Sequence, residues 1–205
     1  MFTNKRVVRQ ALKYSVLPLS LLAAGGFVWQ ASYAAFSATT SNATNQWKAG
    51  TVVLADDDAG VARFTALNIV PAQTDTKCIK VTSTANVAGN VKLYLASKTA
   101  TASLDTYLKF TVQQGTGGDF STCTGFTADL TGGTIINNQT LAAAALANTS
   151  YATAAGSWVT TGVGTETKTY KIQWTFDTTG LSQLQIDALQ AATAGITFTW
   201  ENQNT

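Results

Sequence analysis

The sequence contains no histidine, and this removes the commonest routes to hydrolytic chemistry. A zinc-protease helix needs two imidazoles one turn apart, and a serine or cysteine triad needs an imidazole to carry the proton. Glu166 and Glu201, the only glutamates, have no carboxylate partner at a spacing that indicates a glycosidase. Asp177-Thr178-Thr179-Gly180 only approximates an aspartic-protease motif, and its extra threonine favours a turn. The residue types therefore predict that the protein is not an enzyme and has neither a catalytic site nor a cofactor.

The densest group of charged residues is Asp56-Asp57-Asp58, which Ala59 and Gly60 follow. The spacing does not match an EF-hand loop, in which the oxygen ligands alternate along the chain and end in a distant glutamate. Three neighbouring carboxylates still suit a looser Ca²⁺ site that carbonyl and water oxygens complete. The interpretation that we prefer is a solvated turn between two strands. Asp56, Asp57 and Asp58 are thus a secondary calcium candidate, and no other metal site is predicted.

Cys78 and Cys123 are the only cysteines. They form neither a CxxC pair nor a cluster with metal-ligand spacing. In an exported protein, two such cysteines are expected to form one disulfide that stabilises the fold. The alternative is a pair of buried free thiols.

The first 34 residues have the order of a secretory signal peptide: a basic stretch, an apolar run and a site of small residues. The basic stretch contains Lys5, Arg6, Arg9 and Lys13. The apolar run covers residues 16–28, and Ser32 and Ala34 suit the shallow pockets of signal peptidase. We therefore expect cleavage between Ala34 and Ala35. The competing interpretation is an uncleaved membrane anchor, but the run is short for a span of about 20 residues and contains Pro18.

Removal of this leader changes the charge balance. All four leader charges are basic, so the rest of the chain has nine Lys and Arg against eleven acidic residues and a net charge of −2. No basic patch remains to suggest nucleic acid or an anionic lipid surface as a partner. The expected partners are signal peptidase during export and other copies of the chain, and the expected membrane contact is through the leader alone. Residues 35–205 are expected to form one domain, with an extended N-terminal segment over 35–47.

The remaining sequence predicts strands separated by turn-rich loops. Four segments alternate apolar and polar residues with the period of half-buried strands: 91–95, 108–112, 170–176 and 196–200. Weaker candidate strands cover 51–54, 62–69 and 78–82. So many strands in one domain favour an all-β fold, an antiparallel β-sandwich.

Two segments break this pattern and predict short helices. Residues 140–148 form an alanine-rich run. A second group of apolar residues falls at helical spacing: Leu181, Leu184, Ala188, Leu189 and Ala192. We expect this second helix to cover apolar surface at an edge or end of the sandwich.

Several segments resemble the TasA and camelysin group of exported proteins in Gram-positive bacteria, whose precursors are cut by the SipW type of signal peptidase. They are Ala35-Phe36-Ser37-Ala38-Thr39-Thr40-Ser41-Asn42, Asn45-Gln46-Trp47-Lys48-Ala49-Gly50-Thr51-Val52, Asp56-Asp57-Asp58, Cys78-Ile79-Lys80-Val81 and Phe198-Thr199-Trp200-Glu201. The resemblance implies a jelly-roll-like β-sandwich that is secreted to the cell surface or the biofilm matrix, where TasA forms fibres. Camelysin is classed as a metalloprotease, a role that does not carry over because this chain has no histidine. The chain also has Pro71-Ala72 where the group usually has a Pro-Gly turn.

These features favour a structural protein of the cell surface or extracellular matrix. After cleavage, the segment 35–47 is free to add as a strand to the open edge of a neighbouring sandwich, which would generate filaments. The alternative is a secreted module that binds carbohydrate or a surface partner through exposed aromatic rings. Trp174 and Trp200 are in phase with the apolar faces of their strands and are expected in the core. Trp47 and Trp158 are the better candidates for exposure, although packing is the preferred interpretation for them too.

Overall fold

The computed structural model describes residues 37–40, 52–62, 64–66 and 68–204, with side chains from residue 52 onward. The chain separates into two units, Met1–Ala35 and Phe36–Thr205. The predicted signal peptide, its cleavage site at Ala34 and Ala35, and Trp47 lie outside the described residues. The same holds for the segment 35–47 apart from 37–40.

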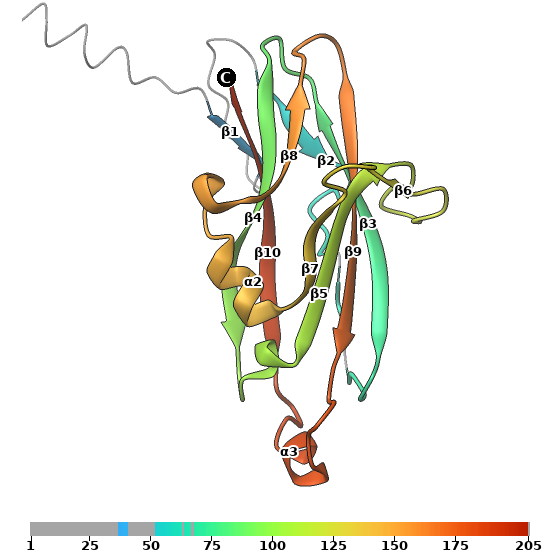
Figure 1. The fold of residues 1–205 in the computed structure, drawn as a ribbon, viewed down its shortest axis with the longest axis vertical. Coiled ribbons are helices and arrows are strands. Elements are labelled where there is room, and N and C mark those ends of the chain that lie inside the picture. Colours follow the sequence, from blue (N-terminus) through green and yellow to red (C-terminus); the bar gives the residue numbers. More distant parts are fainter. Residues whose placement is uncertain (1–36, 41–51, 63, 67, 205) are drawn as a thin grey trace, which may run out of the picture. The chain divides into compact units, whose positions relative to one another are not determined.

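The second unit consists mainly of strands, with a few short helices (Figure 1). The strands are β1 (Ser37–Thr40), β2 (Leu54–Asp56), β3 (Thr74–Ser83), β4 (Gly89–Ala100), β5 (Leu108–Thr116), β6 (Thr127–Ala128), β7 (Thr134–Thr140), β8 (Ala155–Thr160), β9 (Glu166–Phe176) and β10 (Ala194–Asn204). The helices are the 3₁₀ turns η1 (Leu104–Thr106) and η2 (Tyr151–Thr153) and the α-helices α2 (Leu141–Ala147) and α3 (Gln183–Asp187).

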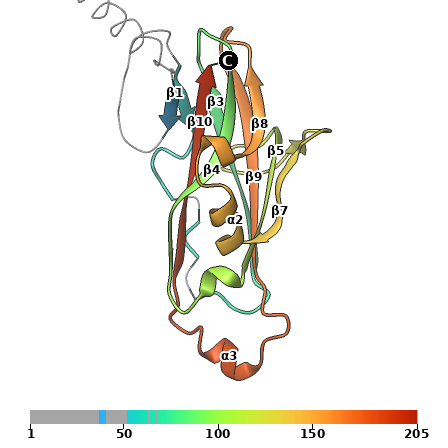
Figure 2. The same cartoon turned by 60° about the vertical axis from the view of Figure 1, so that its left-hand side comes forward.

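The strands form two antiparallel sheets that pack face to face (Figures 1 and 2). Sheet A has the order β1-β10-β4-β8, and sheet B has the order β2-β3-β9-β5-β6, with β7 also paired to β5. In chain order, the strand changes sheet from β1 to β2, from β3 to β4, from β4 to β5, from β7 to β8, from β8 to β9 and from β9 to β10. The predicted all-β sandwich is therefore confirmed.

The core lies between the two sheets because the inward residues of both alternate with outward polar ones. In β4, Val91, Leu93 and Leu95 are buried, and their neighbours Lys92 and Tyr94 face outward. The inward residues of β9 are buried in the same way: Tyr170, Ile172, Trp174 and Phe176. All four segments predicted from alternation are strands: 91–95 in β4, 108–112 in β5, 170–176 in β9 and 196–200 in β10.

Two of the weaker strand predictions fail in part or in full. Residues 78–82 lie in β3 as predicted, but β2 begins only at Leu54. The described part of 62–69 contains no strand, so that prediction is wrong. Phe64 and Ile69 pack against the core from an irregular segment, and Asn68 has a positive φ of 53°, which interrupts an extended backbone. Phe64 and Ile69 are thus partly buried without pairing to a neighbouring strand.

The two predicted helices have different outcomes. The Thr140 hydroxyl caps α2 by accepting from the Ala143 N–H at 3.1 Å, and Leu141 and Ala144 are buried, as expected. The second helix is shorter than predicted, since α3 covers only five residues. Leu184 is 80% exposed, so α3 does not bury a continuous apolar stripe, although Leu189 beyond it does contact the core. Within the described residues, no helix combines the length and the apolar character needed to cross a membrane.

Candidate functional site

The feature of most functional interest is the edge of sheet A at β10. β1 pairs antiparallel with the end of β10, from Ser37 opposite Gln203 to Thr40 opposite Trp200. On its other side, β10 pairs with β4 from Ala194 to Asn204. β1 therefore covers four residues of an eleven-residue strand (Figure 2). In the described part of the chain, no strand lies beside Ala194–Thr199 on that edge.

The inner side of β10 at this edge combines an aromatic core with a buried amide. The Trp200 ring lies 5.2 Å from the Tyr170 ring, centroid to centroid, and both side chains are buried. Asn202, opposite Ala38 of β1, is fully buried, and its side-chain oxygen and nitrogen have no hydrogen-bond partner among the described atoms. A shift of β10 by one residue against β4 would turn Trp200 and Asn202 outward, so burial of these side chains specifies the β10–β4 register.

The outer side of the same region has a buried carboxylate. Glu201 is 8% exposed and accepts a hydrogen bond from the Gln203 side-chain nitrogen at 2.8 Å. Partial burial raises the pKa of Tyr94, and the charge and hydrogen bond of Glu201 raise it further. Lys92 lies opposite Glu201 on β4, but its ammonium lies 4.7 Å from the centroid of the Tyr151 ring. β10 pairs with β4 at ten positions and with β1 at four, so β1 is the less extensively paired neighbour of β10.

The sequence pattern indicated only some of the residues around Glu201. The outward position of Tyr94 follows from its alternation with buried leucines in β4. Tyr151 gave no such signal, because it lies in a 3₁₀ turn that crosses to β4, where its hydroxyl donates to the Asn90 carbonyl at 2.8 Å. Burial raises the pKa of Tyr151, and the charge of Glu201 adds to that effect.

The aspartates predicted as a secondary calcium candidate accept hydrogen bonds from backbone groups near and far in the sequence. Asp57 accepts from the backbone N–H of Lys80 at 2.8 Å and of Phe120 at 2.7 Å, one to each carboxylate oxygen. Asp58 accepts from the Gly60 N–H at 2.7 Å. Burial and the neighbouring Asp58 raise the pKa of Asp56 to about 6. Within the described residues, no group of three or more acidic or cysteine side chains has the placement to hold a metal ion.

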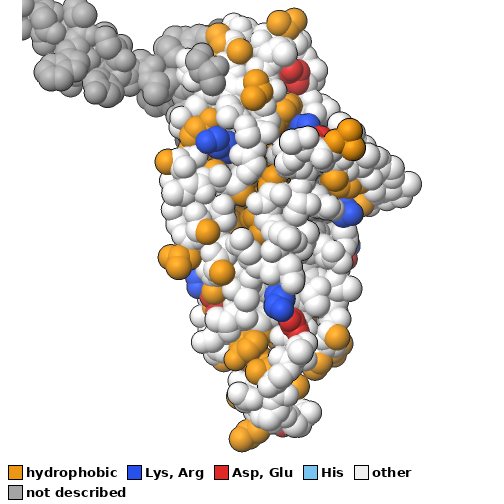
Figure 3. Space-filling view, viewed as in Figure 1, with side chains coloured by type: hydrophobic (Ala, Val, Ile, Leu, Met, Phe, Trp, Pro, Cys, Tyr) orange, Lys and Arg blue, Asp and Glu red, His pale blue; other side chains and the backbone are white. Residues whose placement is uncertain are grey.

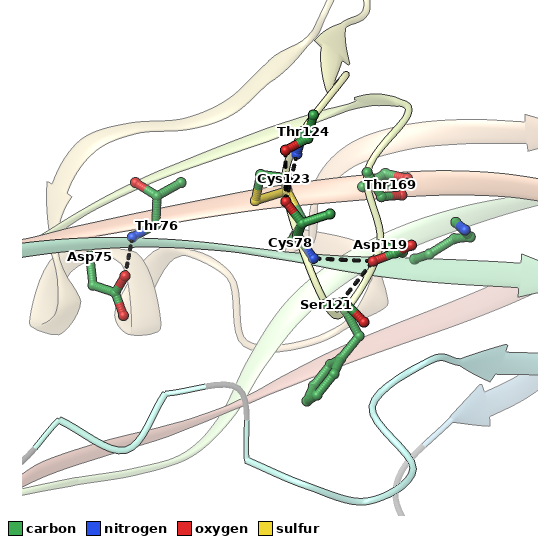
Figure 4. The surroundings of a disulfide bond; sticks show 12 residues. Asp75, Thr76, Cys78, Asp119, Ser121, Cys123, Thr124 and Thr169 are labelled. Atoms are coloured by element: carbon green, nitrogen blue, oxygen red, sulfur yellow. Dashed lines mark hydrogen bonds between the residues drawn. A yellow bond between two sulfur atoms is a disulfide. The ribbon is translucent and has the colours of Figure 1, made fainter.

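The predicted disulfide between Cys78 and Cys123 is present, with a Cα–Cα distance of 5.3 Å (Figure 4). We call residues 117–126 the strap, because they leave β5, cross β9 and join β3 at Cys78 on the outer side of sheet B. Within the strap, the Asp119 carboxylate accepts from the Ser121 and Thr122 N–H groups. Asp57 binds the strap a second time through Phe120.

The other residues considered from the sequence are spread through the fold. Glu166 begins β9 and accepts from Thr161, whereas Asp177 follows the opposite end of β9. The hydrogen bond from Lys109 and those from Thr179 hold the pKa of Asp177 well below its usual value. The structure therefore does not bring these carboxylates together as a pair.

The tryptophans do not form an exposed aromatic platform in the described residues. Trp174 and Trp200 are in the core as predicted, and Trp158 is also buried, with 7% exposure. In the view of Figure 3, apolar side chains are scattered among polar ones and do not form one continuous patch.

No family model matches this chain, and no curated protein matches it. The similarity to the TasA and camelysin group thus stays an expectation from short sequence segments.

Proposed function

We propose that this chain is a secreted structural protein of the cell surface or extracellular matrix, and that its copies assemble by exchanging β1. The observation that carries the proposal is the position of β1. It is an edge strand of four residues that pairs, among the described residues, with β10 alone, and it begins at the third residue after the predicted cleavage site. The strand that export processing would release is thus a strand that a neighbouring copy can supply.

Exchange of β1 costs little enthalpy, because the contacts made with a neighbour's β10 are the same as those made within one copy. Each copy donates one β1 and accepts one, which is a head-to-tail arrangement that yields open filaments when it does not close into a ring. Each backbone hydrogen bond contributes about 0.5–1.5 kcal/mol net, so a strand of this length gives weak, concentration-dependent exchange. A high local concentration at the cell surface favours assembly under these conditions.

In this proposal, cleavage of the leader determines when assembly can begin. While the leader is attached, the chain just before β1 remains at the membrane, and β1 has little freedom to reach another copy. Cleavage after Ala34 frees this end. The disulfide supports the secreted location, because disulfides persist in oxidising compartments outside the cytosol.

The experiment compares protein that begins at Ala35 with the proline variants Ala38→Pro and Thr39→Pro. Neighbouring amides alternate in direction along a strand, so one of these two N–H groups faces β10, and proline removes it. Gln183→Pro is the matched control, because Gln183 is the first residue of α3, where proline is tolerated. We expect filaments by negative-stain electron microscopy from the parent and the control, and fewer from the variant that loses the β10 hydrogen bond.

Monomers from all four proteins at high concentration would overturn assembly by β1. The carbohydrate- or partner-binding alternative would then be tested by glycan and surface-partner screens.

A further inference from the structure

Five buried side chains between the two sheets have polar atoms with no hydrogen-bond partner among the described atoms. They come from four strands of both sheets, and we call them the internal polar groups: Ser83 in β3, Gln114 in β5, Tyr170 in β9, and Trp200 and Asn202 in β10. Their exposed fractions lie between 0% and 5%. Buried polar atoms in native proteins are nearly always hydrogen-bonded, so each of these calls for a partner such as an ordered water or an ion.

Two of the internal polar groups, Gln114 and Tyr170, lie directly opposite each other on neighbouring strands of sheet B. Both belong to the inward set of their strand, so their side chains share one face of the sheet. The Gln114 amide nitrogen donates to the Ser157 carbonyl at 3.2 Å. This contact orients the amide, and it leaves the Gln114 Oε1 atom as an acceptor without a donor.

The Tyr170 hydroxyl is the complementary donor. Burial raises the pKa of Tyr170, and the negative charge of Asp129 raises it further, so the hydroxyl keeps its proton. Asp129 is the residue whose backbone N–H donates to the Gln114 carbonyl, at 3.0 Å. Its carboxylate is already bound by the Lys168 ammonium, at 2.9 and 3.1 Å. A donor and an acceptor that both lack a partner therefore lie on adjacent strands.

The facing strand of sheet A adds further donors and an acceptor. The Trp200 ring lies 5.2 Å from the Tyr170 ring, centroid to centroid, and its Nε1 atom is an unpartnered donor. Asn202 is the next inward residue of β10, and its Oδ1 atom would lie only 2.2 Å from a Cβ on Gly89. Turning the Asn202 amide over would only exchange its two atoms, both of which are unpartnered.

We propose that the interior between the sheets binds ordered water at the internal polar groups, and that one water molecule accepts from the Tyr170 hydroxyl and donates to Gln114 Oε1. Water fits because the five side chains are uncharged and present donors and acceptors together, whereas a simple ion would use only one kind. Their near-complete burial also suits a small molecule that makes two to four hydrogen bonds. This inference concerns the interior of one copy and does not rest on β1 exchange.

The first test removes the hydroxyl and keeps the ring, in Tyr170→Phe. If the hydroxyl is bound to water, its loss should lower the equilibrium constant for folding by about two- to tenfold. If it has no partner, its removal relieves a desolvation cost and raises the constant by about fivefold or more. Guanidinium unfolding of the chain from Ala35 measures this constant, at low protein concentration. An unchanged or raised constant in Tyr170→Phe would overturn the proposal.

Tyr107→Phe is the matched control, because Tyr107 is only partly buried and is not one of the internal polar groups. We expect it to change the folding constant by less than about twofold.

The second test observes the water directly, in a high-resolution crystal structure of the parent chain from Ala35. We expect a water oxygen within about 2.7–3.2 Å of both Tyr170 Oη and Gln114 Oε1. A direct hydrogen bond between these two atoms, or no water density at either, would overturn the proposal. Loss of filaments in the proline variants of β1 would leave both tests unchanged, so the two proposals fail separately.

Discussion

Opening the disulfide between Cys78 and Cys123 is expected to lower the stability of the domain by a large amount without unfolding it. The two cysteines are 45 residues apart in the sequence. For a closed loop of this size, the chain-entropy model gives a stabilisation of about 4 kcal/mol at 25 °C, through restriction of the unfolded chain. Few domains have a stability of more than about 15 kcal/mol, so this is a substantial share.

The folded state is expected to survive because the strap has a second attachment. Asp57 accepts from Lys80 on β3 and from Phe120 in the strap, both through backbone N–H groups. Hydrogen bonds to a charged group contribute about 1.5–3 kcal/mol each, so the strap should stay on sheet B after the disulfide is removed. The effect of the double variant Cys78→Ala, Cys123→Ala is then mainly on the unfolded state.

The assay is guanidinium unfolding followed by tryptophan fluorescence, because Trp158, Trp174 and Trp200 are all buried and report on loss of the core. The oxidised parent is compared with the double variant and with the reduced parent, which should agree with each other. Ser121→Ala, in the same strap, is the control and should change the free energy of unfolding by less than about 0.5 kcal/mol. A loss below about 1 kcal/mol in the double variant would refute the reasoning from loop closure.

Two further predictions concern the turn before β3 and the aspartate at the end of β2. Ala72 follows Pro71 with a positive φ of 63°, so Ala72→Gly should raise the free energy of unfolding by about 0.5–1 kcal/mol; a lower melting temperature would contradict this. The pKa of Asp56 is raised to about 6 by burial and by Asp58, so the native state retains a proton that the unfolded chain releases near pH 4. Stability should therefore fall as pH rises from about 4 to 6, and Asp56→Asn should flatten this part of the curve measured by chemical denaturation; an unchanged curve would contradict the assignment.

The turn before β3 has alanine in a backbone conformation that favours glycine, since Ala72 has a positive φ of 63°. The Gln73 N–H donates to the Val70 carbonyl at 3.0 Å, which closes the turn with alanine in the left-handed position. The geometry that glycine normally serves is thus kept, at a cost to the backbone.

The strands of the core were predictable because alternation is a local property. Each residue of β4 or β9 faces the core or the solvent according to its position in the pleat, whatever strand lies beside it. The disulfide was predictable for a different reason, since a chain with two cysteines has only one possible pairing. The segment 62–69 was mispredicted because local strand preference does not supply a partner strand.

The candidate site was much less accessible to sequence reasoning. The sequence indicated an extended segment after the leader, but not that Ser37–Thr40 pairs with β10 of its own chain. It marked Asp57 as one of three charged neighbours, but not as the group that joins Lys80 to the strap. It also did not indicate that the Asp75 carboxylate accepts from the Thr76 N–H of β3.

The sequence by itself thus determined the fold class, the inward faces of the main strands, the position of α2 and the disulfide pairing, because each depends on residue types and short-range periodicity. Only the tertiary structure decided which strands lie at the edges, which of those edges are covered, and which carboxylates occupy their free N–H groups. The physical reason is that strand pairing joins segments from distant parts of the chain, such as β1 and β10. Their register depends on how the whole sandwich closes, and no local pattern contains that information.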